Sequence, residues 1–433
     1  MSRTTGIRSR RAALTILRQV REGRPFEAAL DRVAHSLPEV DRRLAHELAA
    51  GVLRQRSSLD QRLTPLIPRG WSSVNSELQD ILRLGVYQLT ALERVPAHAA
   101  VDTSVALAKQ ASGTRGAAFV NAVLRRLTDS SPPESREAAD TAQDLAAKYS
   151  HPYWLVSRWL ETFGPEQTET LLRWNNTRPR LVAQPAREDL ASLETRWRAA
   201  GIELAPAPFG AGIIPGRTRP AELPGYAEGD FIIQDPAQAL LARFAAPPKR
   251  ATIYDACAAP GGKTIALGRS ADVLAGDINF RRARRLADNL ARAGSGREHV
   301  VVADARKPPL REVGVVLLDA PCLGTGTFAR HPDARWRVTP EALARVVELQ
   351  RDLLDSTAGI VAPGGLLIYS TCSLEPEENQ HQVEWFLSRH PEFCREPAPD
   401  IPNSLISADG DLVILPQLHG IDGAYAARLR RSA

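Results

Sequence analysis

The chain has 433 residues, enough for two or three domains, and 43% of them are hydrophobic, enough for packed cores. Its net charge of +5 is compatible with nucleic acid but is weak evidence for it. The four cysteines (Cys257, Cys322, Cys372 and Cys394) form no CxxC pair, so neither a zinc site nor a disulfide framework is expected. No apolar stretch is long enough for a membrane span or a signal peptide, and the expected location is the cytoplasm.

Residues 1–130 are predicted to form an all-helical domain. Apolar residues recur at helical spacing in residues 11–20, 27–33, 41–53 and 76–92. Ser76 is a candidate N-cap for the last of these helices. Seven arginines from Arg3 to Arg24 are candidates for contacts with RNA phosphate, although a run of this density is about as often a solvated face.

A stretch rich in Ser and Pro indicates a linker over residues 131–149, and a smaller α/β connecting module is predicted over residues 150–230. Helices that carry Trp154 and Trp159 begin this module. Indole rings can stack on bases, but tryptophans at helical spacing are interpreted here as core residues. Residues 181–184 are predicted to form a strand.

The stretch from Ala251 to Thr264 indicates a short buried strand, a glycine turn and the start of a helix. In this layout, backbone N–H groups at a helix N-terminus meet a ligand at the carboxyl end of a strand. The turn is not a P-loop, because Cys257 stands where that motif has its first glycine, and the GxGxxG fingerprint is also absent. A nucleoside ligand with a carboxylate remains, which describes S-adenosylmethionine. A plain strand-to-helix turn is the alternative.

Four further apolar runs are predicted to be strands, and each ends in an acid or a cysteine. They cover residues 273–277, 299–304, 315–322 and 365–372. Asp277 lies 22 residues after Asp255, as expected for a carboxylate that binds ribose hydroxyls. The carboxyl ends of parallel strands share one edge, so a Rossmann-like α/β domain with a mostly parallel sheet is predicted for residues 231–433. Residues 411–416 and 423–428 are expected to close the sheet.

Several motifs resemble the RNA cytosine-5 methyltransferases of the Sun/RsmB group. They are residues 255–264, 319–322, 330–333 with Trp336, 370–373 and 375–379. In the helical region, residues 41–48, 95–101 and 119–127 are similar to the NusB-like RNA-binding domain. The chain departs from the family pattern at residues 182–184, at Gln238 and at Ala424.

Methylation of carbon 5 of cytosine requires a thiolate that adds to carbon 6, an acid near the ring and a base for release. This chemistry alone does not choose between Cys322 and Cys372. The resemblance implies that Cys372 is the nucleophile, that Cys322 assists release, and that Asp319 hydrogen-bonds or protonates cytosine N3. Cys394 is assigned to packing.

The resemblance also implies S-adenosylmethionine as the cofactor. The turn that would cradle its methionine part consists of Cys257, Ala258, Ala259, Pro260, Gly261, Gly262 and Lys263. Asp277 is expected to bind the ribose and Asp304 the adenine amine, and Asp319 is included in the cofactor set. Lys263 either pairs with the methionine carboxylate or only begins its helix. Arginines and a histidine are candidates for RNA phosphate, unless salt bridges within their loop explain them: Arg330, His331, Arg335 and Arg337.

The expected function is methyl transfer from S-adenosylmethionine to C5 of a cytosine in small-subunit (16S) rRNA, free or in an immature subunit. The alternatives are a tRNA cytosine-5 methyltransferase and a non-catalytic RNA-binding antitermination or assembly factor. A monomer is expected, with no metal and no membrane partner.

Overall fold

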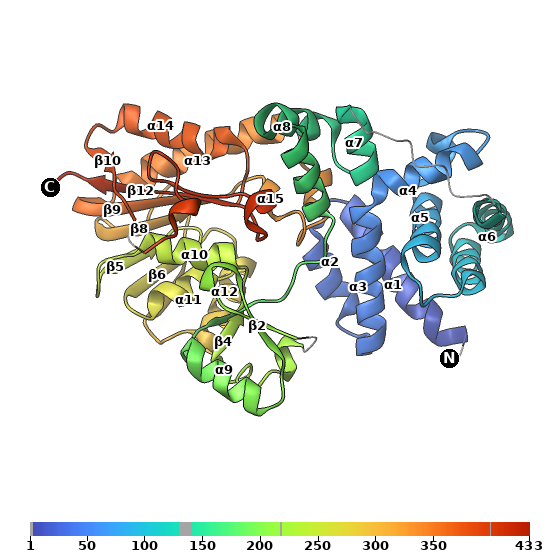
Figure 1. Cartoon of the computed structure of the whole chain (residues 1–433), viewed down its shortest axis with the longest axis horizontal. Coiled ribbons are helices and arrows are strands. Elements are labelled where there is room, and N and C mark those ends of the chain that lie inside the picture. The colour runs from blue at the N-terminus through green and yellow to red at the C-terminus, as the bar shows by residue number, and fades with distance from the viewer. Residues whose placement is uncertain (1–2, 130–140, 217–218, 399) are drawn as a thin grey trace. The chain divides into compact units, whose positions relative to one another are not determined.

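The computed structural model describes the chain except for residues 1–2, 130–140, 217–218 and 399 (Figure 1). The chain divides into two compact units. The helical unit consists of Met1–Thr177 and Phe328–Arg337, and the sheet unit consists of Arg178–Thr327 and Val338–Ala433. The predicted boundaries of the domains stay predictions. Most of the predicted linker lies outside the described residues, and its last part is helix, not linker.

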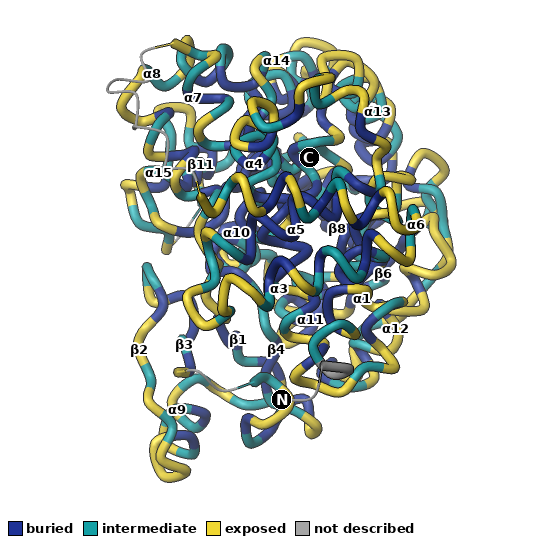
Figure 2. Tube along the Cα trace, turned by 90° about the vertical axis from the view of Figure 1, so that its right-hand side faces the viewer, coloured by how far each residue is buried: buried dark blue, intermediate teal, exposed yellow. Residues whose placement is uncertain are grey.

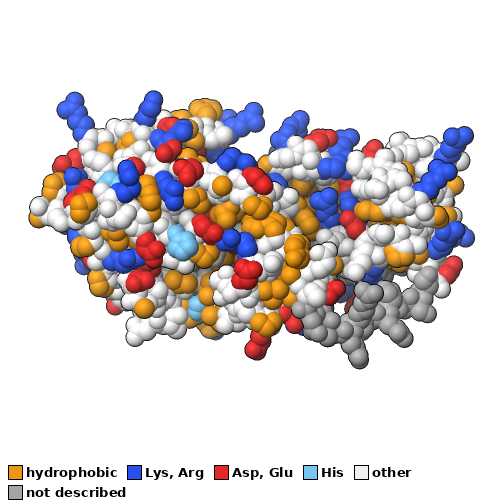
Figure 3. All heavy atoms as spheres, turned by 90° about the horizontal axis from the view of Figure 1, so that it is seen from above, with side chains coloured by type: hydrophobic (Ala, Val, Ile, Leu, Met, Phe, Trp, Pro, Cys, Tyr) orange, Lys and Arg blue, Asp and Glu red, His pale blue; other side chains and the backbone are white. Residues whose placement is uncertain are grey.

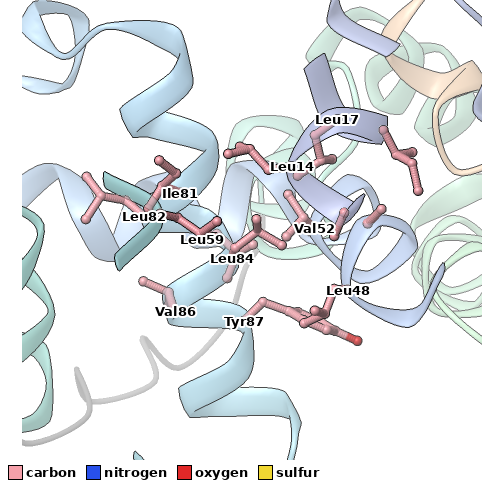
Figure 4. Packing of buried hydrophobic residues seen from close by; sticks show 14 of the residues in the cluster. Leu14, Leu17, Leu48, Val52, Leu59, Ile81, Leu82, Leu84, Val86 and Tyr87 are labelled. Atoms are coloured by element: carbon pink, nitrogen blue, oxygen red, sulfur yellow. The ribbon is translucent and has the colours of Figure 1, made fainter. Parts of the chain in front are cut away.

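The helical unit is built from α-helices. They are α1 (Arg3–Arg21), α2 (Phe26–Ala34), α3 (Glu39–Arg54), α4 (Arg56–Leu63), α5 (Ser76–Ala91), α6 (Ala97–Asp129), α7 (Ala142–Tyr149) and α8 (Tyr153–Asn175). Leu48, Ile81 and Tyr87 belong to the core between them (Figure 4). Gly51 is required there, because a Cβ on it would lie 1.9 Å from Cζ of Tyr87. The helical prediction for this region is confirmed.

Two details of the helical unit differ from the sequence predictions. The N-cap of α5 is Asn75, whose side chain accepts from the Leu78 N–H, and Ser76 is the first helical residue. Arg10 in the basic run is buried and donates to Oε1 of Gln88 at 2.8 Å, so it is not available to RNA phosphate. Figure 3 shows basic side chains scattered among acidic ones on the face it presents.

A small antiparallel sheet opens the sheet unit. Its strands are β1 (Ala183–Pro185), β2 (Leu204–Pro206), β3 (Ile213–Pro215) and β4 (Phe231–Ile233), in the order β2-β3-β1-β4. Helix α9 (Leu190–Ala199) contributes Trp197, whose ring packs edge-on against Phe231 with centroids 4.9 Å apart. The predicted strand at 181–184 is confirmed, and it begins at Ala183.

The main sheet has eight strands. They are β5 (Thr252–Asp255), β6 (Asp272–Asp277), β7 (Glu298–Val302), β8 (Val313–Asp319), β9 (Val361–Thr371), β10 (Phe393–Arg395), β11 (Leu412–Ile414) and β12 (Ala424–Arg431). The order is β10-β12-β9-β8-β5-β6-β7, and β11 pairs with β12. Strands β5 to β9 are parallel, whereas β12 runs antiparallel to β9. The predicted mostly parallel sheet and its closing strands are confirmed.

Helices cover both faces of this sheet (Figure 1). They are α10 (Pro236–Ala245), α11 (Gly262–Gly268), α12 (Phe280–Ala293), α13 (Pro340–Ala358) and α14 (Gln380–Arg389), and a short helix, α15 (Pro416–His419), precedes β12. Alternate residues of β8 enter the two resulting cores: Val315 and Leu317 on one face, Val316 and Leu318 on the other. Figure 2 shows the middle of this strand buried, and residues 315–318 are all buried. Strand β5 lies between β6 and β8, so the strand order reverses there, which is where ligands bind in open α/β sheets.

In the part of the chain that the structure describes, no helix combines the length and the hydropathy that a membrane span needs.

Candidate active site

Two free thiols lie face to face at the carboxyl ends of neighbouring strands. Strands β8 and β9 pair in parallel with Asp319 opposite Ser370, so Cys322 and Cys372 follow at the same edge. Their sulfur atoms are 3.3 Å apart, and the Cys372 N–H points at Sγ of Cys322 at 3.4 Å. Both side chains are half-buried. The structure therefore brings together the two cysteines that the sequence singled out.

The pKa of the Cys322 thiol is shifted by its surroundings. The hydrogen bond with Cys372, together with burial, raises the pKa of Cys322 well above that of an ordinary thiol. Cys322 is therefore protonated at neutral pH and can donate its S–H to an anionic sulfur opposite it.

Asp319 ends β8, and both of its carboxylate oxygens are hydrogen-bonded. Nζ of Lys263 donates to Oδ2 at 2.7 Å and Oγ of Ser370 donates to Oδ1 at 3.0 Å. Burial is the largest single effect and would lower the pKa of Lys263, but the charge and hydrogen bond of Asp319 and the other negative charges nearby together outweigh it, so the pKa is raised and the ammonium stays charged. Lys263 also donates to the side chain of Gln238, one of the residues at which the chain departs from the family pattern. The lysine thus binds Asp319, which neither prediction for it anticipated.

The glycine turn between β5 and α11 has almost no room for side chains. Gly261 has φ of +108°, and a Cβ on it would lie 2.7 Å from Cδ1 of Leu286. Not every amide of the turn is available, because the Ala258 N–H donates to the Gly276 carbonyl at 2.8 Å and Pro260 has no N–H. The predicted cradle is therefore narrower than a full row of amides. Burial, followed by the charge of Asp319, raises the pKa of Cys257 to about 12, so this thiol is no nucleophile at neutral pH.

Asp255, at the end of β5, is a site residue that the sequence analysis did not select. It is fully buried, and its Oδ2 accepts from the hydroxyl of Thr264 at 2.7 Å. Its Oδ1 is buried without a hydrogen-bond partner among the described residues, and burial raises the pKa of this carboxyl to about 7. An orphaned carboxylate oxygen beside the glycine turn fits a ligand that carries an ammonium group, as S-adenosylmethionine does. The signal in the sequence was an acid placed directly before the turn.

The other two strand-end acids differ in how far they are committed to protein partners. Asp277 is buried at the end of β6, where Oδ1 accepts from the Asn279 N–H at 2.9 Å and Oδ2 pairs with Arg282 at 3.1 Å. Asp304 lies two residues beyond the end of β7 and binds the side chain and the N–H of Arg306, bonds that lower its pKa. The structure places Asp277 at the rim as predicted, whereas Asp304 stabilises its own turn.

In the segment Phe328–Arg337, the structure corrects the phosphate prediction for Arg335. Arg335 is fully buried and donates to Oδ1 of Asn176 and to the Asn175 carbonyl, both at 2.7 Å. Burial lowers the pKa of this guanidinium to about 9. Arg337 pairs with Asp333 at 2.9 Å, as the alternative of salt bridges within the loop foresaw. Arg335 is therefore a structural residue of the helical unit.

The assignment of Cys394 to packing is wrong, because its side chain on β10 is exposed and contributes nothing to a core. Among the described residues, no cluster of three His, Cys, Asp or Glu side chains could hold a metal ion.

A Rossmann-like sheet with a glycine turn beside an acid-ended strand is typical of the class of enzymes that bind a nucleoside or nucleotide cofactor. Two family models match the chain: 16S rRNA methyltransferase RsmB/F over residues 242–430, and the NusB family over residues 7–129. The chain belongs to the 16S rRNA methyltransferase RsmB/F family. The resemblance stated from the motifs is thereby confirmed, and so is S-adenosylmethionine as the cofactor.

Individual relatives agree over nearly the whole length. A probable ribosomal RNA small subunit methyltransferase B of Synechocystis sp. is 35% identical over 98% of this chain and 100% of its own. Ribosomal RNA small subunit methyltransferase B of Vibrio cholerae is 34% identical over 98% of this chain and 97% of its own. The crystal structure of PH0851 superposes with a TM-score of 0.82 at 25% identity, covering 100% of this chain and 99% of that chain. NSun6 from Pyrococcus horikoshii has the same fold at 19% identity, with a TM-score of 0.57, and the match covers 64% of this chain and 97% of that chain.

Proposed function

We propose that this chain transfers a methyl group from S-adenosylmethionine to C5 of a cytosine in small-subunit rRNA. The observation that carries the proposal is the pair of free thiols, 3.3 Å apart, at the strand ends next to Asp319. A single thiol would suffice for addition to carbon 6, and a second thiol beside it suits a reaction in which the first must later be released. The names of the relatives support rRNA as the substrate.

The cofactor supplies an electrophilic methyl group on a sulfonium. Asp277, buried at the end of β6, would hold the ribose hydroxyls, and the orphaned oxygen of Asp255 would accept from the ammonium group. The remaining amides of the glycine turn would face the methionine carboxylate, as at other helix N-termini. Asp304 would reach the adenine amine only if its bonds to Arg306 yield.

Cys372 would add to carbon 6 of the cytosine and so make carbon 5 nucleophilic. Asp319, held in place by Lys263 and Ser370, would donate a proton to N3 and so limit the negative charge on the ring. After methyl transfer a base removes the proton from carbon 5, and the bond between carbon 6 and sulfur breaks to return the Cys372 thiolate. Cys322 would assist this release, because its S–H can donate to the sulfur that departs.

The test is transfer of labelled methyl to 16S rRNA, free and in immature subunits, and to tRNA, followed by bisulfite mapping of 5-methylcytosine. We expect Cys372→Ala to abolish transfer and Cys322→Ala to accumulate a covalent protein–RNA adduct. An adduct in Cys372→Ala instead would reverse the two roles. Transfer to tRNA alone would make tRNA the substrate, and no transfer to any RNA would favour a non-catalytic RNA-binding factor.

A further inference from the structure

The stretch that follows Cys372 matches the family over residues 375–379, yet none of these residues has a role in the proposed chemistry. Strand β9 ends at Thr371, and the chain then enters a short 3₁₀ helix, η7 (Pro376–Glu378), before α14. Glu378 is completely buried although it carries a carboxyl group. Burial of such a group is costly unless hydrogen bonds compensate for it, so its partners indicate what it does.

The carboxyl of Glu378 is bonded to both thiol-bearing loops. Oε2 accepts from the backbone N–H of Leu323 at 3.0 Å, and Leu323 directly follows Cys322. Oε1 accepts from the hydroxyl of Ser373, which directly follows Cys372. One side chain thus joins the residues next to the two sulfurs.

Two neighbouring amides complete the connection. Nε2 of Gln350, on α13, donates to Oε2 of Glu378 at 3.0 Å and to the Pro321 carbonyl at 2.9 Å, so the backbone is held on both sides of Cys322. Asn379 does the same for Cys372: its Oδ1 accepts from the Thr371 hydroxyl at 2.6 Å and its Nδ2 donates to the Ser373 carbonyl at 3.0 Å.

We propose that Glu378 is a positioning residue that fixes the separation of the Cys322 and Cys372 sulfurs. Hydrogen bonds to a carboxylate are directional and roughly twice as strong as neutral ones, so they suit a site in which the sulfur positions must be held closely. The effect of this spacing on catalysis rests on the proposed function, because release assisted by Cys322 needs its S–H to stay beside the departing sulfur.

The burial of Glu378 favours a role in positioning the thiols over a role in stabilising the fold. It raises the pKa of Glu378 to about 7, against the lowering effect of its hydrogen bonds, so the folded chain holds the carboxylate at a cost. This cost lowers the stability that the hydrogen bonds of Glu378 provide, so stability alone does not account for a carboxyl group at this place.

The first experiment measures the spacing of the thiols without any methyl transfer. Phenylarsine oxide condenses with two adjacent thiols, forming two As–S bonds and releasing one water. We expect intact-mass titration of the full chain to show one arsenical bridging Cys322 and Cys372. Glu378→Ala should weaken this binding at least about tenfold, because the two loops lose their common partner. Equally tight binding by Glu378→Ala would overturn the proposal.

The controls separate positioning from loss of structure. Glu378→Gln should rescue arsenical binding, because its amide can accept from Leu323 and donate to Ser373. Glu384→Gln, an exposed carboxyl on α14, should bind like the native chain. If Glu378→Ala does not fold, Gln350→Ala removes the bonds to Pro321 and Glu378 and should weaken binding in the same direction.

The second experiment measures methyl transfer by the same variants. We expect Glu378→Ala to lower kcat at least about tenfold, to leave KM for S-adenosylmethionine within about twofold and to accumulate the covalent adduct. An unchanged kcat would overturn the proposal. If the native chain transfers no methyl, the proposed function fails, whereas the arsenical titration still decides whether Glu378 sets the thiol spacing.

Discussion

Glu378 in the sheet unit and Arg335 in the helical unit are both ionisable side chains buried among neutral hydrogen-bond partners. Glu378 accepts from a backbone N–H, a hydroxyl and an amide. Arg335 donates to a side-chain amide and to backbone carbonyls. Burial moves both pKa values towards the uncharged form, to about 7 for Glu378 and to about 9 for Arg335.

The difference lies in where these values stand relative to neutral pH. Arg335 stays charged under physiological conditions, so its bonds are a fixed part of the fold. Glu378 is close to the midpoint of its titration, so the charge beside the thiol pair changes within the range in which an enzyme works. Similar burial thus gives a permanent anchor in one unit and a pH-sensitive one in the other.

Arg335→Met should give the largest effect on stability. It leaves several buried carbonyls without a donor, so we expect the unfolding free energy of the helical unit to fall by about 4 kcal/mol. Urea unfolding of the full chain would measure this. Arg42→Met, an exposed arginine on α3, should change it by less than about 0.5 kcal/mol. A loss below about 1 kcal/mol for Arg335→Met would contradict the role of anchor.

The pH dependence of stability should distinguish Glu378. Its folded pKa of about 7 exceeds the ordinary value of 4.5, so its stabilising contribution is complete below pH 4.5 and is lost as pH rises to about 7. The loss should amount to about 3 kcal/mol. Glu378→Gln should flatten this part of the curve, as urea titrations across the window would show. The same slope in native and variant chains would refute the expected titration.

Asp255→Asn tests the orphaned oxygen beside the glycine turn. If Oδ1 accepts from the cofactor's ammonium, the amide should weaken S-adenosylmethionine binding by about 2 kcal/mol, measured by calorimetry. Asp304→Asn is the matched control, because this acid is already bonded to Arg306 and should contribute less. A larger loss of affinity for Asp304→Asn than for Asp255→Asn would indicate that Asp304, not Asp255, contacts the cofactor.

Exposed arginines should give the smallest effects. Arg11→Ala on α1 should reduce RNA affinity by less than about 1 kcal/mol and lower the salt slope of binding by about one, if it contacts a phosphate. Filter binding at several salt concentrations would measure both. Arg345→Ala, exposed on α13, is the comparison. Identical slopes for the two variants would leave the N-terminal arginines as a solvated face.

The sequence was most informative where local rules apply. Apolar runs that end in acids predicted the parallel strands, and the shared edge of such strands predicted that Cys322 and Cys372 would meet. Hydrogen-bond partners that are distant in sequence could not be predicted. Arg335 contacts Asn175 across 160 positions, and an arginine in a loop indicates solvent or phosphate rather than a buried carbonyl. The role of Glu378 likewise depends on Leu323, 55 positions away, which no local pattern could reveal.

The membership of Phe328–Arg337 in the helical unit has a consequence for dissecting the protein. The chain passes from one unit to the other three times, and the second passage comes five residues after Cys322. A truncated chain that began at residue 178 would deprive Arg335 of Asn176 and leave the Trp336 indole N–H without the Leu53 carbonyl. The helices are therefore not a removable appendage. We therefore expect that a protease cut or a gene division between the units would reduce the order of residues 323–327, which connect Cys322 to the helical unit.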